Sequence, residues 1–269
     1  MPIVISVPFS FYPLNKGCEQ AHTAVASALR NISSSDRGTP LVFTSDSVSL
    51  DGSTPMPAVD EALSLKARQV FSRGDISVFV GGDHGVTFPL VKAFAEKHTN
   101  PGIVIFDAHP DCSEASRLPH RDDLVLALVR EKVIKPEHIL IVGVRQWQKG
   151  ELQFLRENKI KYYTLAEISS DGAIDVCDAV MSVAKDFGSL YVSIDMDVVD
   201  PAFAPGVSTP EAGGLSGREL LYFIQRLKLL KNFRAADVME INPEKDRDTV
   251  TVRLGAKVVA ELLSSPVRF

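Results

Sequence analysis

Residues 193–210 read SIDMDVVDPAFAPGVSTP, and this stretch decides the fold that the sequence predicts. Its start continues a β-branched and aromatic run from Leu190, which is typical of a buried strand. Asp195 and Asp197 lie two positions apart, so an extended backbone would point both carboxylates to one face. Such close like charges repel each other, and a divalent cation between them is the simplest remedy. Asp200, directly before Pro201, is expected to cap the loop that follows.

The rest of the chain alternates apolar strand candidates with amphipathic helix candidates. Other strands are expected at 3–7, 41–44, 76–80, 103–106, 139–144, 161–163 and 235–241. This alternation implies right-handed βαβ units, and hence an α/β fold with a mostly parallel sheet between two layers of helices. The chain has 269 residues and no repeat, low-complexity tract or linker, so residues 1–269 are expected to form one domain.

Composition argues against several classes of protein. The formal net charge of -5 does not favour nucleic acid as a partner. The three cysteines are scattered without a CxxC pair, which argues against a disulfide framework or a thiolate zinc site. No apolar run is long enough for a membrane span, and the apolar start MPIVISVPF reads as a strand and not as a signal peptide. A cytoplasmic protein without a membrane or nucleic-acid partner is therefore expected.

Residues with metal-ligand chemistry follow the predicted strands at their carboxyl ends, where open α/β sheets bind ligands. They are His84, Asp107, His109, Asp111, Asp195, Asp197 and Glu240. The two histidines and four aspartates form an oxygen-rich set that suits Mn²⁺, with Co²⁺, Fe²⁺ or Zn²⁺ as substitutes. Six protein ligands are too many for one open catalytic ion and fit two. For Glu240, a buried paired acid and a cation-binding acid both stay open, and GGDHG at 81–85 is either a plain turn or a phosphate cradle.

Four segments together resemble the signatures of a known family. GGDHG at 81–85, DAHPD at 107–111, SIDMDVVDPAFAPGVSTP at 193–210 and EINP at 240–243 match the ureohydrolases in order and spacing. That family comprises arginase, agmatinase, formimidoylglutamase, guanidinobutyrase and proclavaminate amidinohydrolase. The resemblance implies a hydrolase that cleaves a C–N bond of a linear guanidino or amidino compound. It also implies an eight-stranded arginase-like sheet, two Mn²⁺ per chain and a homo-oligomer, commonly a trimer or hexamer.

The resemblance also implies a role for each site residue. One ion would be bound by His84, Asp107, Asp111 and Asp195, and the other by His109, Asp107, Asp195 and Asp197. Asp111 would also orient the attacking hydroxide. Glu240 would pair with the substrate guanidinium, and His120 would relay a proton to the leaving nitrogen.

The substrate is predicted to be agmatine-like, with urea and an amine as products, because segments typical of arginase are absent. The loop at 112–119 is short, glutamines stand at 146 and 148 where acids would be expected, and Val207 and Ser208 depart from the usual PGTGTP. Arginase, formimidoylglutamase and guanidino-acid hydrolase activities stay open, because Arg117 or Arg121 could bind a carboxylate. Trp147 either lines the pocket or packs in the core. Two other classes stay open as alternatives: a zinc deacetylase of related architecture and a metal-binding regulatory homologue without catalysis.

Overall fold

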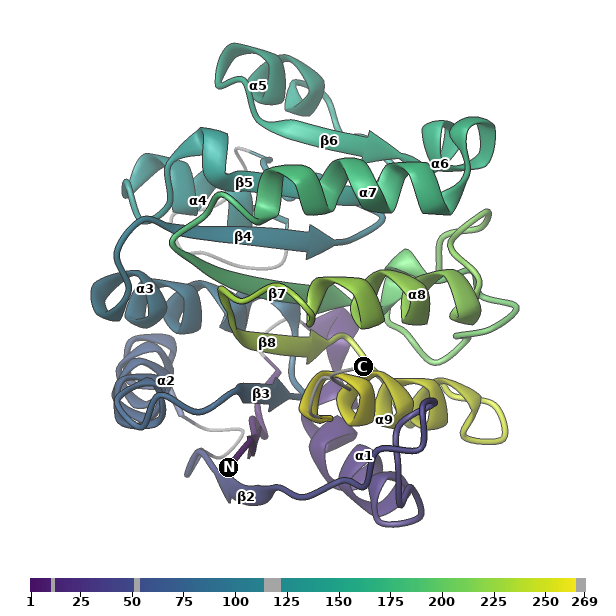
Figure 1. Cartoon of the computed structure of the whole chain (residues 1–269). Coiled ribbons are helices and arrows are strands. Elements are labelled where there is room, and N and C mark those ends of the chain that lie inside the picture. The colour runs from purple at the N-terminus through teal and green to yellow at the C-terminus, as the bar shows by residue number, and fades with distance from the viewer. Residues whose placement is uncertain (11–12, 51–53, 114–121, 265–269) are drawn as a thin grey trace.

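Eight parallel strands form one sheet, in the order β2-β1-β3-β8-β7-β4-β5-β6 (Figure 1). The computed structural model describes residues 1–10, 13–50, 54–113 and 122–264. The strands are β1 (Ile3–Ser6), β2 (Thr44–Ser47), β3 (Ser77–Val80), β4 (Pro101–Phe106), β5 (Ile139–Val144), β6 (Lys161–Thr164), β7 (Ser189–Asp195) and β8 (Phe233–Met239). The predicted α/β class and the parallel sheet are confirmed, and every strand pair is parallel.

Helices cover both faces of the sheet and create two separate apolar cores. On one face lie α1 (Ala21–Leu29), α6 (Leu165–Asp171), α7 (Ala173–Ala184), α8 (Gly217–Leu227) and α9 (Val250–Leu263). On the other lie α2 (Met56–Phe71), α3 (Thr87–Lys97), α4 (Leu124–Arg130) and α5 (Glu151–Glu157). The strands feed both cores because alternate side chains point to opposite faces: Val78 and Val80 join the first core, and Phe79 joins the second.

Local sequence signals explain where several elements begin. Thr164 with Glu167 and Ser216 with Glu219 form complete capping boxes at α6 and α8, as their spacing predicts. The strand expected at 41–44 was misplaced, since β2 is the polar segment Thr44–Ser47. That strand lies at the sheet edge with mostly exposed side chains, so pairing with β1 fixes its position and an apolar pattern does not.

The strand order places the ends of four strands side by side. β3, β8, β7 and β4 are adjacent, although they follow one another in the sequence as β3, β4, β7 and β8. The chain therefore changes direction across the sheet at its centre, which is where open α/β sheets bind ligands. Within the described residues, no helix combines the length and apolarity needed to cross a membrane.

Candidate active site

His84 reaches the sheet edge through a tight glycine turn after β3. Gly81 and Gly82 have φ of 102° and 84°, and a Cβ on Gly82 would lie 2.3 Å from the carbonyl oxygen of Phe9. The glycines of GGDHG therefore permit a close backbone approach, and His84 then begins the short 3-10 turn η3 (His84–Val86). This favours the turn interpretation over a phosphate cradle.

The ring of His84 is fully buried and faces three carboxylates with one nitrogen. Its Nδ1 lies 3.0 Å from Asp107 Oδ2, 3.1 Å from Asp111 Oδ2 and 3.5 Å from Asp195 Oδ2. Its Nε2 lies 2.9 Å from the hydroxyl of Ser193, on β7. One side of the ring thus contacts a cluster of acids, and the other contacts a single neutral hydroxyl.

Asp107 joins this cluster to a second one around His109. While Asp107 Oδ2 faces His84, Asp107 Oδ1 lies 3.3 Å from His109 Nδ1. Asp197 Oδ2 also lies 3.1 Å from His109 Nδ1. The ligand atoms of His84, Asp107 and Asp111 lie within 4.8 Å of one another, as do those of Asp107, His109 and Asp197. Two adjacent groups able to hold a metal ion therefore share one carboxylate.

Turns, and not a continued strand, bring the aspartates together. Asp195 is the last residue of β7, but Asp197 lies in the 3-10 turn η5 (Met196–Val198), and its N–H donates to Asp195 Oδ1 at 2.8 Å. The N–H of His109 likewise donates to Asp107 Oδ1 at 2.7 Å. The extended backbone expected from Asp195 to Asp197 was therefore wrong, although the two residues do lie close together.

Two of the predicted residues have a backbone conformation that side chains rarely adopt. Asp111 has φ of 48° and Glu240 has φ of 65°. The Asp111 carbonyl accepts hydrogen bonds from the first turn of α4, and the Glu240 N–H donates to the Gly82 carbonyl at 3.0 Å. Neighbouring backbone thus holds both residues in place, and such strain is concentrated at functional sites in proteins.

The buried carboxyl group of Glu240 is fixed by two donors. Its Oε1 accepts from Asn15 Nδ2 at 2.8 Å and from the backbone N–H of His84 at 2.9 Å. Asn15 was not anticipated, because a lone asparagine in a loop gives no sequence signal. The 3.0 Å bond from Glu240 to Gly82 also connects β8 to the turn that carries His84.

Electrostatics show an excess of buried negative charge. Burial and the neighbouring carboxylates raise the pKa of Asp111 and of Asp195. Burial opposes a charge on His109, but Asp107 and Asp197 outweigh it and raise the pKa of His109 to about 12. Burial likewise opposes a charge on His84, and the hydrogen bonds of its ring with Asp107 and Asp111 still raise its pKa. Protons on the two rings balance the acids in the way that cations would.

The donor set matches the chemistry of a transition-metal or manganese site. It combines imidazole nitrogen with carboxylate oxygen and contains no thiolate, a set that suits Mn²⁺, Zn²⁺, Fe²⁺ or Co²⁺. Because each histidine directs Nδ1 at two or more carboxylates, and Asp107 belongs to both groups, the residues present fit two cations.

Comparison with known proteins identifies the family. The sequence profile of the arginase family matches residues 2–264. The chain belongs to the arginase family. It is 30% identical over 219 residues to arginase from Bacillus caldovelox, covering 76% of this chain and 73% of that protein. It is 30% identical over 205 residues to agmatinase from Salmonella paratyphi B, covering 76% of this chain and 64% of that protein.

Solved structures of the arginase family share the fold of this chain. Proclavaminate amidinohydrolase from Streptomyces clavuligerus superposes with a TM-score of 0.88 at 28% identity, covering 97% of this chain and 90% of that one. Formimidoylglutamase from Bacillus subtilis superposes with a TM-score of 0.91 at 22% identity, covering 97% and 85%, which shows the fold alone. The predicted family and its amidino-hydrolase class are thus confirmed, and the alternative of a zinc deacetylase is excluded.

Metal binding to this arginase-family chain should release protons. The protonated ring of His109 stabilises the metal-free fold fully below its ordinary pKa of 6.5, and this contribution is lost only as pH rises through about 12. A cation at Nδ1 must therefore displace a proton at neutral pH. We expect Mn²⁺ affinity to rise from about pH 6 to about pH 9. Calorimetry in two buffers of different ionisation enthalpy measures the release, and identical heats in both buffers would contradict it.

Arg145 ties together three segments around the site. Its guanidinium donates to the carbonyls of Gly143, Asp197, Val198, Glu211 and Ala212, at distances of 2.6–3.4 Å. The sequence alone assigns this arginine no role. The structure shows that it holds the turn of Asp197 against the loop that carries Glu211.

Arg145→Lys should destabilise the protein by about 2–3 kcal/mol, because lysine cannot donate in a planar fork and several carbonyls lose their donor. Chemical denaturation of the metal-free protein measures this free energy. Arg68→Lys is the matched control, because among the described residues Arg68 forms an ion pair with Glu96 alone, on the surface. This variant should change stability by about 1 kcal/mol or less. Equal losses in both variants would show that the fork of Arg145 is dispensable.

Some predicted residues cannot be placed. His120, Arg117 and Arg121 lie outside the described residues, so the structure does not test their roles. Trp147 is half-buried and packs edge-on against Tyr162, with ring centroids 5.5 Å apart, which favours the packing interpretation.

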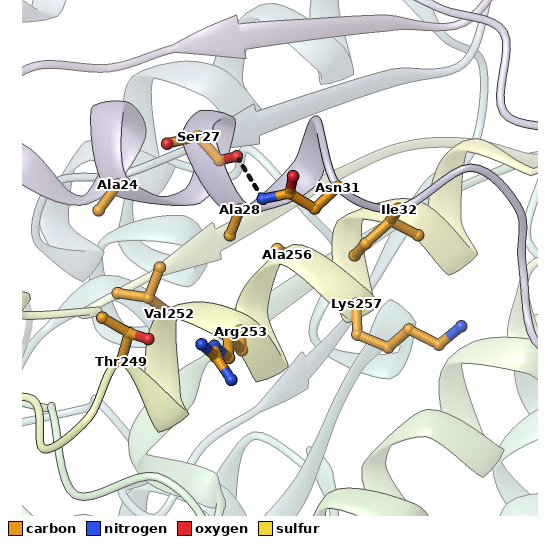
Figure 2. A pocket seen from close by; sticks show the side chains of 10 residues that line it. All are labelled: Ala24, Ser27, Ala28, Asn31, Ile32, Thr249, Val252, Arg253, Ala256 and Lys257. Carbon is orange, nitrogen blue, oxygen red and sulfur yellow. Dashed lines mark hydrogen bonds between the residues drawn. The ribbon is translucent and has the colours of Figure 1, made fainter.

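A cavity of about 770 Å³ lies between α1 and α9, and residues of both helices line it (Figure 2). Small and apolar side chains such as Ala28 and Val252 line it, together with Arg253 and Lys257. Lys257 is neutralised by Asp36 and Glu261. None of the candidate active-site residues that the structure describes lines this cavity.

Proposed function

We propose that this chain is a binuclear-manganese hydrolase that cleaves the guanidino C–N bond of an agmatine-like substrate and releases urea and an amine. The shared position of Asp107 between His84 and His109 is the observation that carries the two-metal assignment. The proposed ligands are His84, Asp107, His109, Asp111, Asp195 and Asp197, as the sequence predicts. The homo-oligomer, the single domain and the cytoplasmic location stay predictions.

The chain's own residues would divide the reaction between them. When bound, two divalent cations supply Lewis-acid chemistry that makes a hydroxide nucleophile available near neutral pH. Asp111 would accept a hydrogen bond from this nucleophile and orient it. Glu240 would hold the guanidinium by charge-assisted hydrogen bonds, which fixes the carbon for attack. The C–N bond then breaks, the carbon leaves as urea, and the departing nitrogen takes a proton, for which His120 is the proposed donor.

Glu211 supports a substrate whose far end is positively charged. Its carboxylate lies 3.8 Å from His109 Nε2, on the side of the ring away from the acid cluster, and its side chain is 30% exposed. Arg145 holds the Glu211 carbonyl at 2.7 Å, so the residue is fixed at the site. A carboxylate there would attract the ammonium of agmatine and repel a substrate carboxylate.

A substrate panel tests the proposal directly. The Mn²⁺-loaded protein is assayed for urea or formamide release from agmatine, arginine, 4-guanidinobutyrate, 3-guanidinopropionate and N-formimidoylglutamate. Agmatine should give the highest kcat/KM. Faster turnover of an acid-tailed compound would overturn the substrate assignment, and a metal-loaded protein that turns over none would support the regulatory homologue.

Glu211→Gln sharpens the same test. We expect kcat/KM for agmatine to fall about tenfold, because one charge contact at a partly exposed position is worth about 1–2 kcal/mol. An alkylguanidine of similar length without the ammonium group should be unaffected. An equal loss for both compounds would mean that Glu211 acts on the metal site and not on the substrate tail.

A further inference from the structure

A buried carboxylate that the proposed reaction does not use lies behind His84. Asp237, inside β8, is fully buried. Its Oδ1 accepts from Ser193 Oγ at 2.7 Å, and its Oδ2 accepts from Tyr191 OH and Thr87 Oγ1, both at 2.9 Å. Three hydroxyls from β7 and α3 therefore surround one acid, and Ser193 also contacts Nε2 of His84 at 2.9 Å.

The hydrogen bonds from Asp237 through Ser193 to His84 determine which ring nitrogen of His84 carries a proton. A serine hydroxyl has one proton, and Ser193 gives it to Asp237. The oxygen of Ser193 can then only accept at its contact with Nε2, so Nε2 must carry a proton. A neutral His84 ring is then left with its lone pair on Nδ1, the nitrogen that faces Asp107 and Asp111.

We propose that Asp237, acting through the hydroxyl of Ser193, is a positioning residue that keeps a proton on Nε2 of His84, so that the neutral ring offers the lone pair of Nδ1 to a cation. This inference rests on the proposed metal site. Tyr191 and Thr87 donate to the second oxygen of Asp237, and only Ser193 joins the carboxylate to His84 among the contacts described. An acceptor behind the second ring nitrogen is how proteins fix the orientation and tautomer of a metal-binding histidine.

The opposite arrangement makes a distinct prediction. If Asp237 carried a proton on Oδ1, it would donate to Ser193, and Ser193 would donate to Nε2. The proton of the neutral ring would then sit on Nδ1 and block the cation. The direction of the hydrogen bonds from Asp237 to His84 thus decides whether the ring can bind metal.

Substitutions at two hydrogen-bond donors of Asp237 distinguish positioning of His84 from general support of the fold. Ser193→Ala removes the bridge to His84 and leaves the other oxygen of Asp237 satisfied. Thr87→Val removes a hydrogen bond from that other oxygen and leaves the bridge intact. We expect Ser193→Ala to weaken Mn²⁺ binding at one of two sites by about 10- to 100-fold, and Thr87→Val to change it less than about threefold. Calorimetry measures both affinities, and the melting temperatures of the metal-free proteins show whether the folds are equally disturbed.

Rescue and spectroscopy complete the test. Ser193→Thr keeps the hydroxyl and should recover most of the affinity. In the Zn²⁺-loaded wild type with ¹⁵N-labelled histidine, the His84 signals should show a proton on Nε2 and metal on Nδ1. Equal affinity losses in Ser193→Ala and Thr87→Val, or a proton on Nδ1, would overturn the inference. A wild type that binds no Mn²⁺ would instead overturn the proposed function.

Discussion

Asp197→Asn should remove one of two bound metal ions and lower urea release about a thousandfold. Asp197 Oδ2 faces His109 Nδ1 at 3.1 Å, while its Oδ1 accepts from the N–H of Ala108 at 3.1 Å. Asparagine keeps the shape and can keep the bond to Ala108, but it removes the negative charge that a cation beside His109 needs. The loss should therefore appear in metal content, measured by elemental analysis, together with the loss of turnover.

Asp200→Asn is the matched control for this prediction. Asp200 lies three positions further on, and its carboxylate accepts from the N–H groups of Ala202, Gly213 and Gly214. It caps the loop as the sequence predicts, so its variant should keep both ions and most of the activity. If Asp197→Asn kept both ions and full turnover, the ligand assignment of Asp197 would be wrong.

Glu240→Gln should leave metal content unchanged and lower kcat/KM by roughly 30- to 5,000-fold, which corresponds to about 2–5 kcal/mol for a buried charge pair. The amide oxygen can still accept from Asn15 and from the His84 N–H, so the local structure should survive. What is lost is the negative charge that would hold a guanidinium. Steady-state kinetics with the best substrate of the panel measure this loss.

Glu244→Gln controls for a charge change in the same segment, because Glu244 is exposed and its carboxylate accepts only from Gln20 among the contacts described. It should change kcat/KM by less than about twofold. If Glu240→Gln lost metal in proportion to activity, Glu240 would support the metal site and would have no direct role toward the substrate.

Strand positions in the centre of the sheet could be predicted because burial on both faces leaves a continuous apolar run there. The residues that follow β3, β4, β7 and β8 could be predicted as one site because parallel strands end at one edge. The path of the chain beyond those ends could not be predicted. Asp111 and Glu240 have a left-handed backbone conformation that no side-chain pattern reveals.

The contacts that support the site residues also could not be predicted from the sequence, for physical reasons. Asn15 and Glu240 are 225 positions apart, and no local pattern records such a pair. Asp237 did offer a signal, because an acid among the buried residues of a strand must find donors. The partners of Arg145 could not be predicted, because its five carbonyl acceptors lie on segments whose paths the sequence does not specify.

The position of β8 has a consequence for how the protein folds during synthesis. β8 lies between β3 and β7, so β2, β1 and β3 pair with the remaining strands only through it. Until Phe233–Met239 leaves the ribosome, two partial sheets each have an unpaired apolar edge, which is a site for aggregation. The same late strand carries Asp237 and leads directly into Glu240. Catalytic competence therefore arrives with the step that closes the sheet, and a nascent chain that stalls earlier has neither.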